Sequence, residues 1–306
     1  LYVTSEAVPF CKTGGLADVA GSLPQSLAAN GDRVSVILPL YQSVADAWRD
    51  RLHFERYTYV RLAWRSLYCG LFSYERQGVT WYFVDNEQYF KRPELYGYYD
   101  DGERFAFFCR AVTELLPLLP EKPDVVHCND WQTALVPIYI RDEAVREEFY
   151  KSVRTVITIH NIEYQGRYGD QVLQDVIGLD KSYFNEGMLA YHRDVNLMKG
   201  AIMASNFVTT VSPTYAQELR TPFYAHGLDG VINQQSFKLE GILNGIDVAH
   251  YNPESDPLVP YHFTVEDRTG KARCKREIQR LFGLNQESEW PLLASVARLV
   301  EQKGIE

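Results

Sequence analysis

Six short apolar runs, most of them followed by a helical pattern, constrain the fold of this chain more than any other feature. The runs cover residues 1–4, 33–38, 123–127, 153–160, 207–211 and 238–243. They are rich in β-branched residues and apolar at successive positions, which is typical of strands buried on both faces. Strands of this kind that alternate with helices form a parallel sheet between two helical layers. The pattern therefore predicts an α/β fold with a doubly wound parallel sheet.

A second region has a different pattern. Aromatic-rich runs cover residues 57–64, 66–74 and 79–84, and Gln77-Gly78 is typical of a tight turn. We interpret residues 55–90 as a β-hairpin inserted into the first domain.

The length of 306 residues is enough for two domains. Residues 243–262 contain Asn244-Gly245 and three prolines, a composition that suits a linker. We predict a first domain over 1–242 and the beginning of a second over 263–306, with a helix at 267–282 and a strand at 291–296. The chain starts inside a predicted strand without Met and stops soon after another, so we expect it to be a fragment.

Composition excludes several classes of partner and site. The net charge is −9, which repels nucleic acid and anionic membranes, and no apolar run is long enough to cross a membrane. The five cysteines are odd in number and lack Cys-x-x-Cys spacing, which favours a reducing compartment. The seven histidines form no His-x-x-x-His pair and there is no Asp-x-Asp triplet. We therefore expect no metal and no cofactor.

The loop between the first predicted strand and the following helix has the sequence Lys12-Thr13-Gly14-Gly15-Leu16. Adjacent glycines let a ligand approach the backbone, and a helix N-terminus favours anions. The loop matches neither the Walker A pattern nor the dinucleotide fingerprint. It predicts a pocket for a phosphate or a sugar, although a simple turn that starts a helix explains the spacing equally well. Pro24 predicts a kink or a late start of this helix.

Polar clusters follow several predicted strands. They are Lys12–Gly15, His127–Trp131, His160-Asn161 and Asn244–Asp247. Because ligands bind at the carboxyl ends of parallel strands, we expect these clusters to converge. Each residue also has a structural interpretation: Asp130 as the cap of a helix over 131–141, His160 as a core histidine, and Asn244-Gly245 as a turn. Lys12, Arg298 and Lys303 are the candidate cations for phosphate.

The motifs at residues 5–9, 12–19, 126–132, 158–161, 244–247 and 297–304 resemble, in order, those of bacterial glycogen synthases and plant starch synthases. The resemblance implies the N-terminal portion of a GT-B glycosyltransferase, with one Rossmann-like domain and only the start of the second. It implies a hexosyltransferase that moves glucose from ADP-glucose to the non-reducing end of an α-1,4-glucan with retention. Since the family's second domain is longer, we expect this segment to be inactive alone.

The resemblance also assigns residues. It implies catalytic roles for Lys12, Asp130 and His160. It implies donor binding by Lys12, Gly14, Gly15, Asp18, Asn244, Arg298 and Lys303. It implies an acceptor side formed by Tyr96, Trp131 and Asn161. The expected partners are ADP-glucose and glycogen or starch, without nucleic acid or membrane, and the expected location is the bacterial cytoplasm, or a plastid if a transit peptide was removed.

Three alternatives stay open at this level. The aromatic content of 13% is compatible with a non-catalytic glucan-binding module. A related GT-B enzyme could use a UDP-sugar. An NAD-dependent dehydrogenase is disfavoured because the Gly-x-Gly-x-x-Gly fingerprint is missing.

Overall fold

The computed structural model describes residues 1–286, 289–297 and 299. The chain divides into two compact units, Leu1–Gly245 and Ile246–Glu306. The finer division into 1–242, 243–262 and 263–306 stays a prediction, because compactness does not show which part folds alone.

Nine strands of the described residues form one sheet in the order β12-β11-β7-β6-β1-β2-β5-β4-β3. All neighbours are parallel except the pairs β5–β4 and β4–β3. The strands are β1 (Tyr2–Val3), β2 (Val34–Pro39), β3 (His53–Leu62), β4 (Arg65–Arg76), β5 (Val79–Asp85), β6 (Val125–Asn129), β7 (Arg154–Ile159), β11 (Phe207–Thr210) and β12 (Leu239–Gly241). The six predicted apolar runs correspond to β1, β2, β6, β7, β11 and β12.

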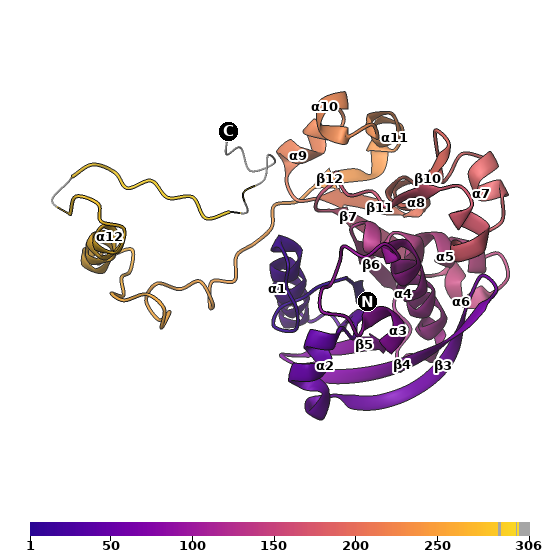
Figure 1. The fold of residues 1–306 in the computed structure, drawn as a ribbon, viewed down its shortest axis with the longest axis horizontal. Coiled ribbons are helices and arrows are strands. Elements are labelled where there is room, and N and C mark those ends of the chain that lie inside the picture. Colours follow the sequence, from indigo (N-terminus) through magenta and orange to yellow (C-terminus); the bar gives the residue numbers. More distant parts are fainter. Residues whose placement is uncertain (287–288, 298, 300–306) are drawn as a thin grey trace. The chain divides into compact units, whose positions relative to one another are not determined.

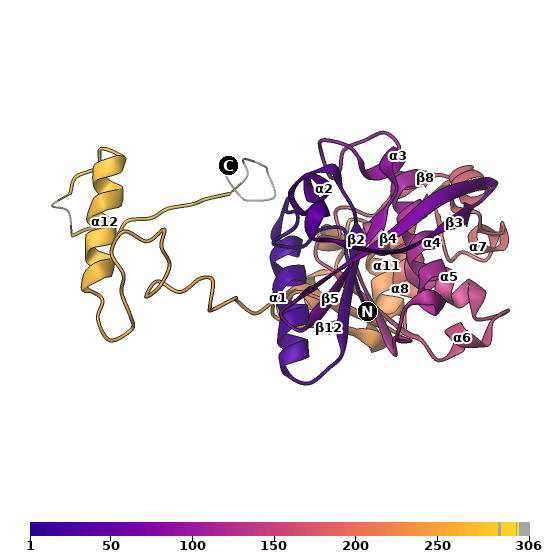
Figure 2. The same cartoon turned by 90° about the horizontal axis from the view of Figure 1, so that it is seen from below.

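Helices cover both faces of the sheet (Figures 1 and 2). The α-helices of the described residues are α1 (Gly15–Ala29), α2 (Gln42–Trp48), α3 (Glu87–Phe90), α4 (Asp101–Leu115), α5 (Leu135–Glu143), α6 (Glu148–Lys151), α7 (Ser182–Asn185), α8 (Leu197–Ala204), α9 (Pro213–Glu218), α10 (Pro222–Ala225), α11 (Asp229–Gln234) and α12 (Thr269–Leu281). Short 3₁₀ turns lie at Arg49–Arg51, Leu116–Leu118, Trp131–Thr133 and Ser236–Lys238, and a π turn lies at Leu173–Ile177. Helices α1, α2 and α9 lie on one face, and α4, α5 and α8 lie on the other. This arrangement confirms the doubly wound α/β fold.

The strand order reverses at β1. From β1 the chain first adds β2 on one side and later returns to add β6 and β7 on the other side. A reversal of this kind opens a crevice between the loops at the carboxyl ends of the two central strands. The crevice lies where the loops after β1 and β6 begin, which are the loops that carry Lys12 and Asp130.

The predicted hairpin is present and extends the sheet beyond β5. Strands β3 and β4 pair from His53 opposite Ser73 to Leu62 opposite Arg65, with an irregularity between Phe54 and Arg56. The turn before β5 has positive φ at both Gln77 and Gly78, as a type I′ turn requires. A separate three-stranded antiparallel sheet, with β8 (Arg167–Gly169), β10 (Asp194–Asn196) and β9 (Ala190–Tyr191), has no counterpart in the sequence prediction.

Helix α1 begins at Gly15 and continues through Pro24, so the predicted late start is wrong. Close packing against the loop after β1 explains part of its stability. A Cβ atom at Gly21 would lie 2.7 Å from the carbonyl oxygen of Val8, so only glycine allows the helix this close approach.

In the second unit the predicted helix is present as α12, but the predicted strand at 291–296 is wrong. These residues have no strand conformation, and Leu293 and Val296 are 90% and 101% exposed. An apolar run forms a strand only where another strand offers backbone hydrogen bonds, and the described residues of this unit contain none. No helix in the described part of the chain combines the length and apolarity needed to cross a membrane.

Candidate active site

The carboxyl ends of β1, β6 and β7 are joined by the side chain of Asn129. This residue is fully buried at the end of β6, and its Nδ2 donates to the carbonyl oxygen of Val3 at 3.0 Å. Its Oδ1 accepts from the Tyr2 hydroxyl at 2.9 Å and lies 2.9 Å from Nε2 of His160. Because the oxygen can only accept, His160 carries its proton on Nε2. The ring of His160 is thereby held at the crevice.

Asp130 forms the second link between β6 and β7. Its carboxylate Oδ1 accepts from the backbone N–H of His160 at 2.8 Å and from that of Asn161 at 3.3 Å. The backbone of Asp130 has φ 56°, a left-handed conformation that a non-glycine residue adopts at a cost. The predicted role as a helix cap is wrong, because the side chain bonds to β7 and not to the turn at Trp131–Thr133. The short loop after β6 is tied instead by the Thr133 hydroxyl, which accepts from the Asn129 N–H at 2.6 Å.

Burial sets the electrostatics of this pair. It lowers the pKa of His160, while the negative charges of Asp130 and Glu6 oppose that shift. Burial also raises the pKa of Asp130, while His160 and the two backbone N–H groups oppose that shift. The result is a neutral imidazole with Nε2 protonated, which leaves Nδ1 as an acceptor.

Glu6 holds the loop that carries the two glycines. It is 3% exposed, and its Oε2 accepts from both the N–H and the hydroxyl of Thr13, each at 2.6 Å. A Cβ atom at Gly14 would make only an ordinary contact with Glu6, and one at Gly15 would meet nothing within 4 Å. The space beside the glycines is therefore open, and packing within the chain does not require glycine there. An open space next to a helix N-terminus is what an anionic ligand needs.

Lys12 and Asp18 form an ion pair across the start of α1. The Lys12 ammonium lies 2.7 Å and 2.8 Å from the two carboxylate oxygens of Asp18. Their side chains are 46% and 39% exposed, so the pair adds little stability but holds the amine beside the glycine loop. Asp18 therefore orients Lys12 at the start of α1.

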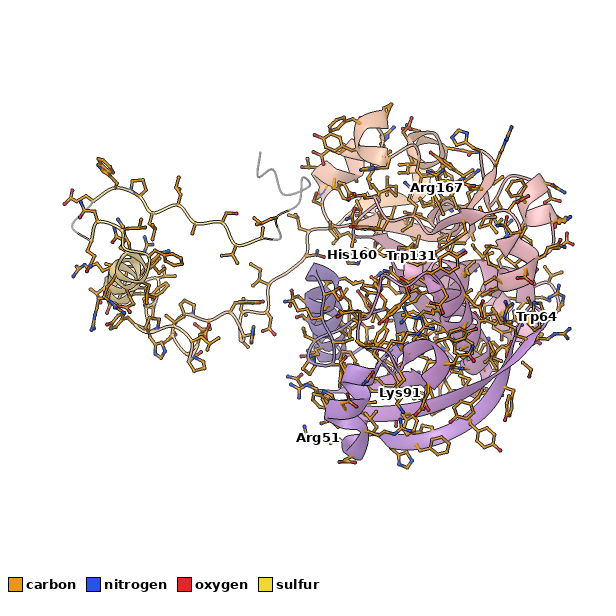
Figure 3. The ribbon with its side chains drawn as sticks, in the orientation of Figure 1. Arg51, Trp64, Lys91, Trp131, His160 and Arg167 are labelled. Atoms are coloured by element: carbon orange, nitrogen blue, oxygen red, sulfur yellow. The ribbon has the colours of Figure 1, made fainter. Side chains whose placement is uncertain are left out.

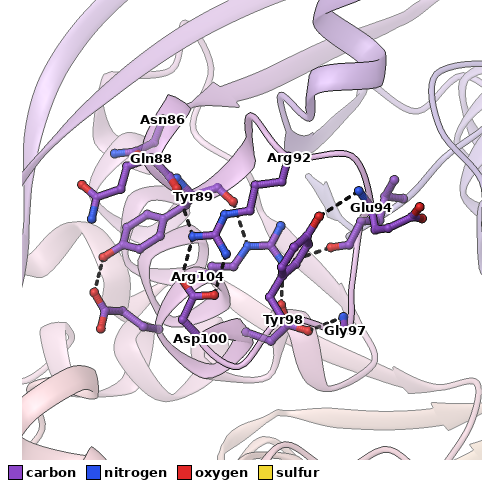
Figure 4. A network of polar contacts seen from close by, with 12 residues as sticks. Asn86, Gln88, Tyr89, Arg92, Glu94, Gly97, Tyr98, Asp100 and Arg104 are labelled. Carbon is purple, nitrogen blue, oxygen red and sulfur yellow. Dashed lines mark hydrogen bonds and ion pairs between the residues drawn. The ribbon is translucent and has the colours of Figure 1, made fainter.

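Tyr96 reaches the same edge from a distant loop. Its hydroxyl donates to Oγ of the buried Ser5 at 2.8 Å, which places the ring beside the loop after β1. The loop over residues 91–100 is held by a network of polar contacts (Figure 4). In this network Arg92 bonds Asp100 through both of its terminal nitrogens, each at 2.6 Å. The buried Arg104 donates to the carbonyl oxygens of Tyr89 and Leu95 at 2.7 Å and 3.1 Å.

Trp131 and Asn161 directly follow Asp130 and His160 in the chain. Figure 3 labels Trp131 and His160. The Trp131 ring packs edge-on against Phe105, with centroids 5.4 Å apart. A Cβ atom at Gly166 would lie 2.7 Å from the Trp131 ring, so this glycine makes room for it. Both Trp131 and Asn161 are partly buried, and the side chain of Asn161 accepts from the Glu163 N–H at 3.0 Å.

Asn244, a predicted donor-binding residue, is not brought together with these. Asn244 is exposed and follows β12, which is four strands from β1 in the sheet. Arg298 and Lys303 lie outside the described residues. The sequence prediction also missed Glu6, Ser5 and Asn129, although all three stand inside motifs that it used. Within the described residues no three His, Cys, Asp or Glu side chains are placed to hold a metal ion.

Comparisons with known proteins show the family to which the chain belongs. The family model described as the starch synthase catalytic domain matches residues 1–234. A glycogen synthase of Geobacillus thermodenitrificans (strain NG80-2) is 47% identical over all 306 residues, which span 63% of that protein. A glycogen synthase of Clostridium beijerinckii is 44% identical and is covered over 64% of its length. The chain thus spans less than two thirds of these curated relatives.

A solved structure shows the same fold. The catalytic domain of Starch Synthase IV from Arabidopsis thaliana, bound to ADP and acarbose, matches 99% of this chain with a TM-score of 0.88 and 37% identity. The match covers 63% of that chain. It confirms the expected GT-B type of fold for the residues compared. With the family model matching most of its length, this chain belongs to the family of starch synthase catalytic domains, together with the bacterial glycogen synthases.

Proposed function

We propose that the full-length protein transfers glucose from ADP-glucose to the non-reducing end of an α-1,4-glucan, with retention of configuration. The observation that carries this proposal is the cluster of Asn129, Asp130 and His160 beside the Glu6-held glycine loop, at the point where the strand order reverses. Relatives named glycogen synthase, and a starch synthase bound to ADP and acarbose, support the choice of substrates. Since the relatives named glycogen synthase are bacterial, a bacterial cytoplasm is the location we favour.

The chemistry needs charges of both signs in fixed places. Breaking the anomeric bond develops positive charge on the glucosyl group and negative charge on the departing diphosphate. Asp130 stabilises the first, and the neutral His160 accepts a hydrogen bond from a sugar hydroxyl at Nδ1. Lys12 and the N-terminus of α1 stabilise the second. Arg298 and Lys303 complete the diphosphate site without a metal, and each contributes roughly 10²–10³-fold to kcat.

The experiment compares Lys12→Ala with the wild-type full-length protein in ADP-glucose-dependent extension of glycogen. We expect kcat/KM for ADP-glucose to fall by roughly 10²-fold, because a charge beside the leaving group is lost. Lys151→Ala, which removes an exposed lysine paired with Glu148, is the control and should not change activity. Wild-type activity in Lys12→Ala would overturn the assigned role. Glucan binding without any transfer by the wild type would favour a non-catalytic module.

The identity of the donor needs its own test. Titration of the intact protein with ADP-glucose and with UDP-glucose, followed by thermal unfolding, compares the two directly, because at equal concentration the ligand that binds more tightly raises Tm more. We expect the larger increase with ADP-glucose. A larger increase with UDP-glucose would replace the proposed donor.

A further inference from the structure

A buried glutamine, Gln165, holds the loop that follows β7. We call residues 160–166 the β7 loop. Gln165 is 5% exposed, and its Nε2 donates to the carbonyl oxygens of Ile162 and His226, each at 3.1 Å. Its Oε1 accepts from Nδ2 of Asn196 at 2.6 Å. One side chain thus joins the β7 loop to the end of β10 and to the turn between α10 and α11.

The orientation of this amide is determined by backbone groups at both ends. Asn196 is fully buried at the start of α8, and its Oδ1 accepts from the Lys199 N–H at 2.9 Å. Its Nδ2 must therefore face Gln165, and the oxygen of Gln165 must face Asn196. The Nε2 group of Gln165 is left opposite two carbonyl oxygens, which can only accept. A side chain of the same size without a donor would leave both carbonyls facing another acceptor.

The turn that supplies the second carbonyl has an unusual backbone conformation. His226 has φ 47°, a left-handed conformation that a non-glycine residue adopts at a cost. A Cβ atom at the next residue, Gly227, would clash with the Tyr191 hydroxyl, so the turn packs closely against β9. Because surrounding contacts fix this turn, its carbonyl is a firm anchor for Gln165.

The β7 loop carries or contacts several residues of the candidate active site. Asp130 bonds the backbone N–H groups at its start, including that of Asn161. At its other end Gly166 has φ 63° and lies against the Trp131 ring, where a Cβ atom would clash. Gln165 therefore lies between the part of the loop that carries Asn161 and the part that packs against Trp131. A shift of the loop would displace both of these residues.

We propose that Gln165 is a positioning residue for glucosyl transfer, which acts through the β7 loop on Asn161 and Trp131. The inference rests on the proposed function and on the acceptor-side roles that the family resemblance implies for these two residues. Gln165 itself is buried, and its three amide hydrogen bonds all go to protein groups. Since a misplacement of about 1 Å can lower a rate roughly 10²-fold, the amide that holds this loop has a large effect on kcat.

The test uses Gln165→Glu in the full-length protein. Burial and the two carbonyl oxygens favour the protonated carboxyl, and documented buried glutamates have pKa values of about 8–9. At about pH 6 the protonated side chain can donate to one carbonyl and accept from Asn196, whereas at about pH 9.5 the carboxylate can donate to neither carbonyl. We expect kcat with glycogen, divided by the wild-type value at the same pH, to be about one third at the lower pH and roughly 10²-fold reduced at the higher pH. KM for ADP-glucose should stay unchanged, because Glu6 holds the glycine loop.

Asn196→Asp tests the same contact from the other side. It keeps the oxygen that accepts from Lys199 but removes the donor to Gln165, so kcat should fall roughly tenfold at about pH 7. This variant decides the question if Gln165→Glu unfolds at the higher pH. The control is Asn206→Ala, which removes an acceptor for the Thr155 N–H at the opposite end of β7 and should leave kcat unchanged.

Hydrogen exchange of the backbone amides of residues 160–166 supplies a readout that does not need activity. We expect these amides to exchange faster in Asn196→Asp than in the wild type, and at the wild-type rate in Asn206→Ala. A relative kcat of Gln165→Glu that does not depend on pH, or equal losses of kcat in Asn206→Ala, would overturn the proposal. If the wild type transfers no glucose while exchange still rises in Asn196→Asp, the proposed function fails and the role of Gln165 in holding the loop stands.

Discussion

The cluster at the end of β6 differs in construction from the tyrosine face, the exposed rings of Tyr57, Tyr59 and Tyr68 on β3 and β4. In the cluster each polar side chain has several partners on other strands: Asn129 contacts Tyr2, Val3 and His160. On the tyrosine face the side chains contact one another and solvent. The difference teaches what each region can do. A cross-linked cluster fixes atoms for chemistry, whereas exposed rings that contact only one another hold no polar group in a fixed place.

The largest effect is expected for a substitution at His160. His160→Ala removes the ring that Asn129 holds at the crevice, and we expect kcat for glucosyl transfer to fall by roughly 10²–10³-fold. Because the ring bonds to the buried Asn129, we also expect a lower thermal unfolding temperature, and kcat is measured well below that temperature. Steady-state kinetics with ADP-glucose and glycogen provide the measurement.

His53→Ala is the matched control, since His53 is an exposed histidine at the start of β3 on the outer hairpin. It should leave kcat unchanged. Equal losses in both variants would remove the distinction between the two regions.

The second prediction concerns the stability of the protein at low pH, which depends on His127 of β6. Burial lowers the pKa of His127 from 6.5 to about 4, and the charge of His160 acts in the same direction. The unfolded chain therefore binds this proton first, so the stability is fully present above pH 6.5 and is lost as the pH falls toward 4. The full loss amounts to about 3 kcal/mol of unfolding free energy. Urea unfolding across this range measures it.

His127→Gln should flatten this pH dependence, because glutamine does not titrate. His53→Gln on the hairpin should leave the slope as in the wild type. A slope that persists unchanged in His127→Gln would show that other groups cause the acid sensitivity.

The two regions also differ in how far the sequence could reveal them. The strands of the parallel half were predictable because apolar runs buried on both faces leave a clear pattern, and the hairpin because Gln77-Gly78 marks a tight turn. The run at 291–296 has the same local pattern but no neighbouring strand, so local sequence alone predicted it wrongly.

Within the site the sequence predicted the residues that face the crevice better than those that hold them. His160 and Asp130 were predicted because they directly follow strands. Asn129 was missed because its importance depends on Val3 and His160, which are far away in the chain. Glu6 was missed because its bonds to Thr13 depend on how the loop after β1 folds back. Asp130 was predicted to cap a helix, but its side chain bonds to the backbone after β7. Its backbone has a positive φ, which no local sequence pattern indicates.

A smaller effect is expected for the loop after β1, which the carboxylate of Glu6 holds through Thr13. Glu6→Gln keeps the size of the side chain but turns two charge-assisted hydrogen bonds to Thr13 into neutral ones. We expect kcat/KM for ADP-glucose to fall about tenfold, with most of the change in KM, because the loop beside the donor loosens. Glu186→Gln, at an exposed position, is the control. An unchanged KM would show that the loop keeps its place without the charge.

The smallest effect is expected in the loop over residues 91–100, which carries Tyr96 to the buried Ser5. Arg92 and Asp100 are 22% and 35% exposed, and the hydrogen bond from Arg92 lowers the pKa of Asp100. Lysine cannot form the paired bonds of arginine, so Arg92→Lys should cost less than about 1 kcal/mol of stability. Since this loop positions Tyr96, KM for glycogen should rise roughly two- to threefold with kcat unchanged. Arg146→Lys, in the exposed pair with Asp142, should alter neither quantity. A large fall in kcat for Arg92→Lys would contradict this prediction. It would show that the loop acts on the reacting groups and belongs with the candidate active site.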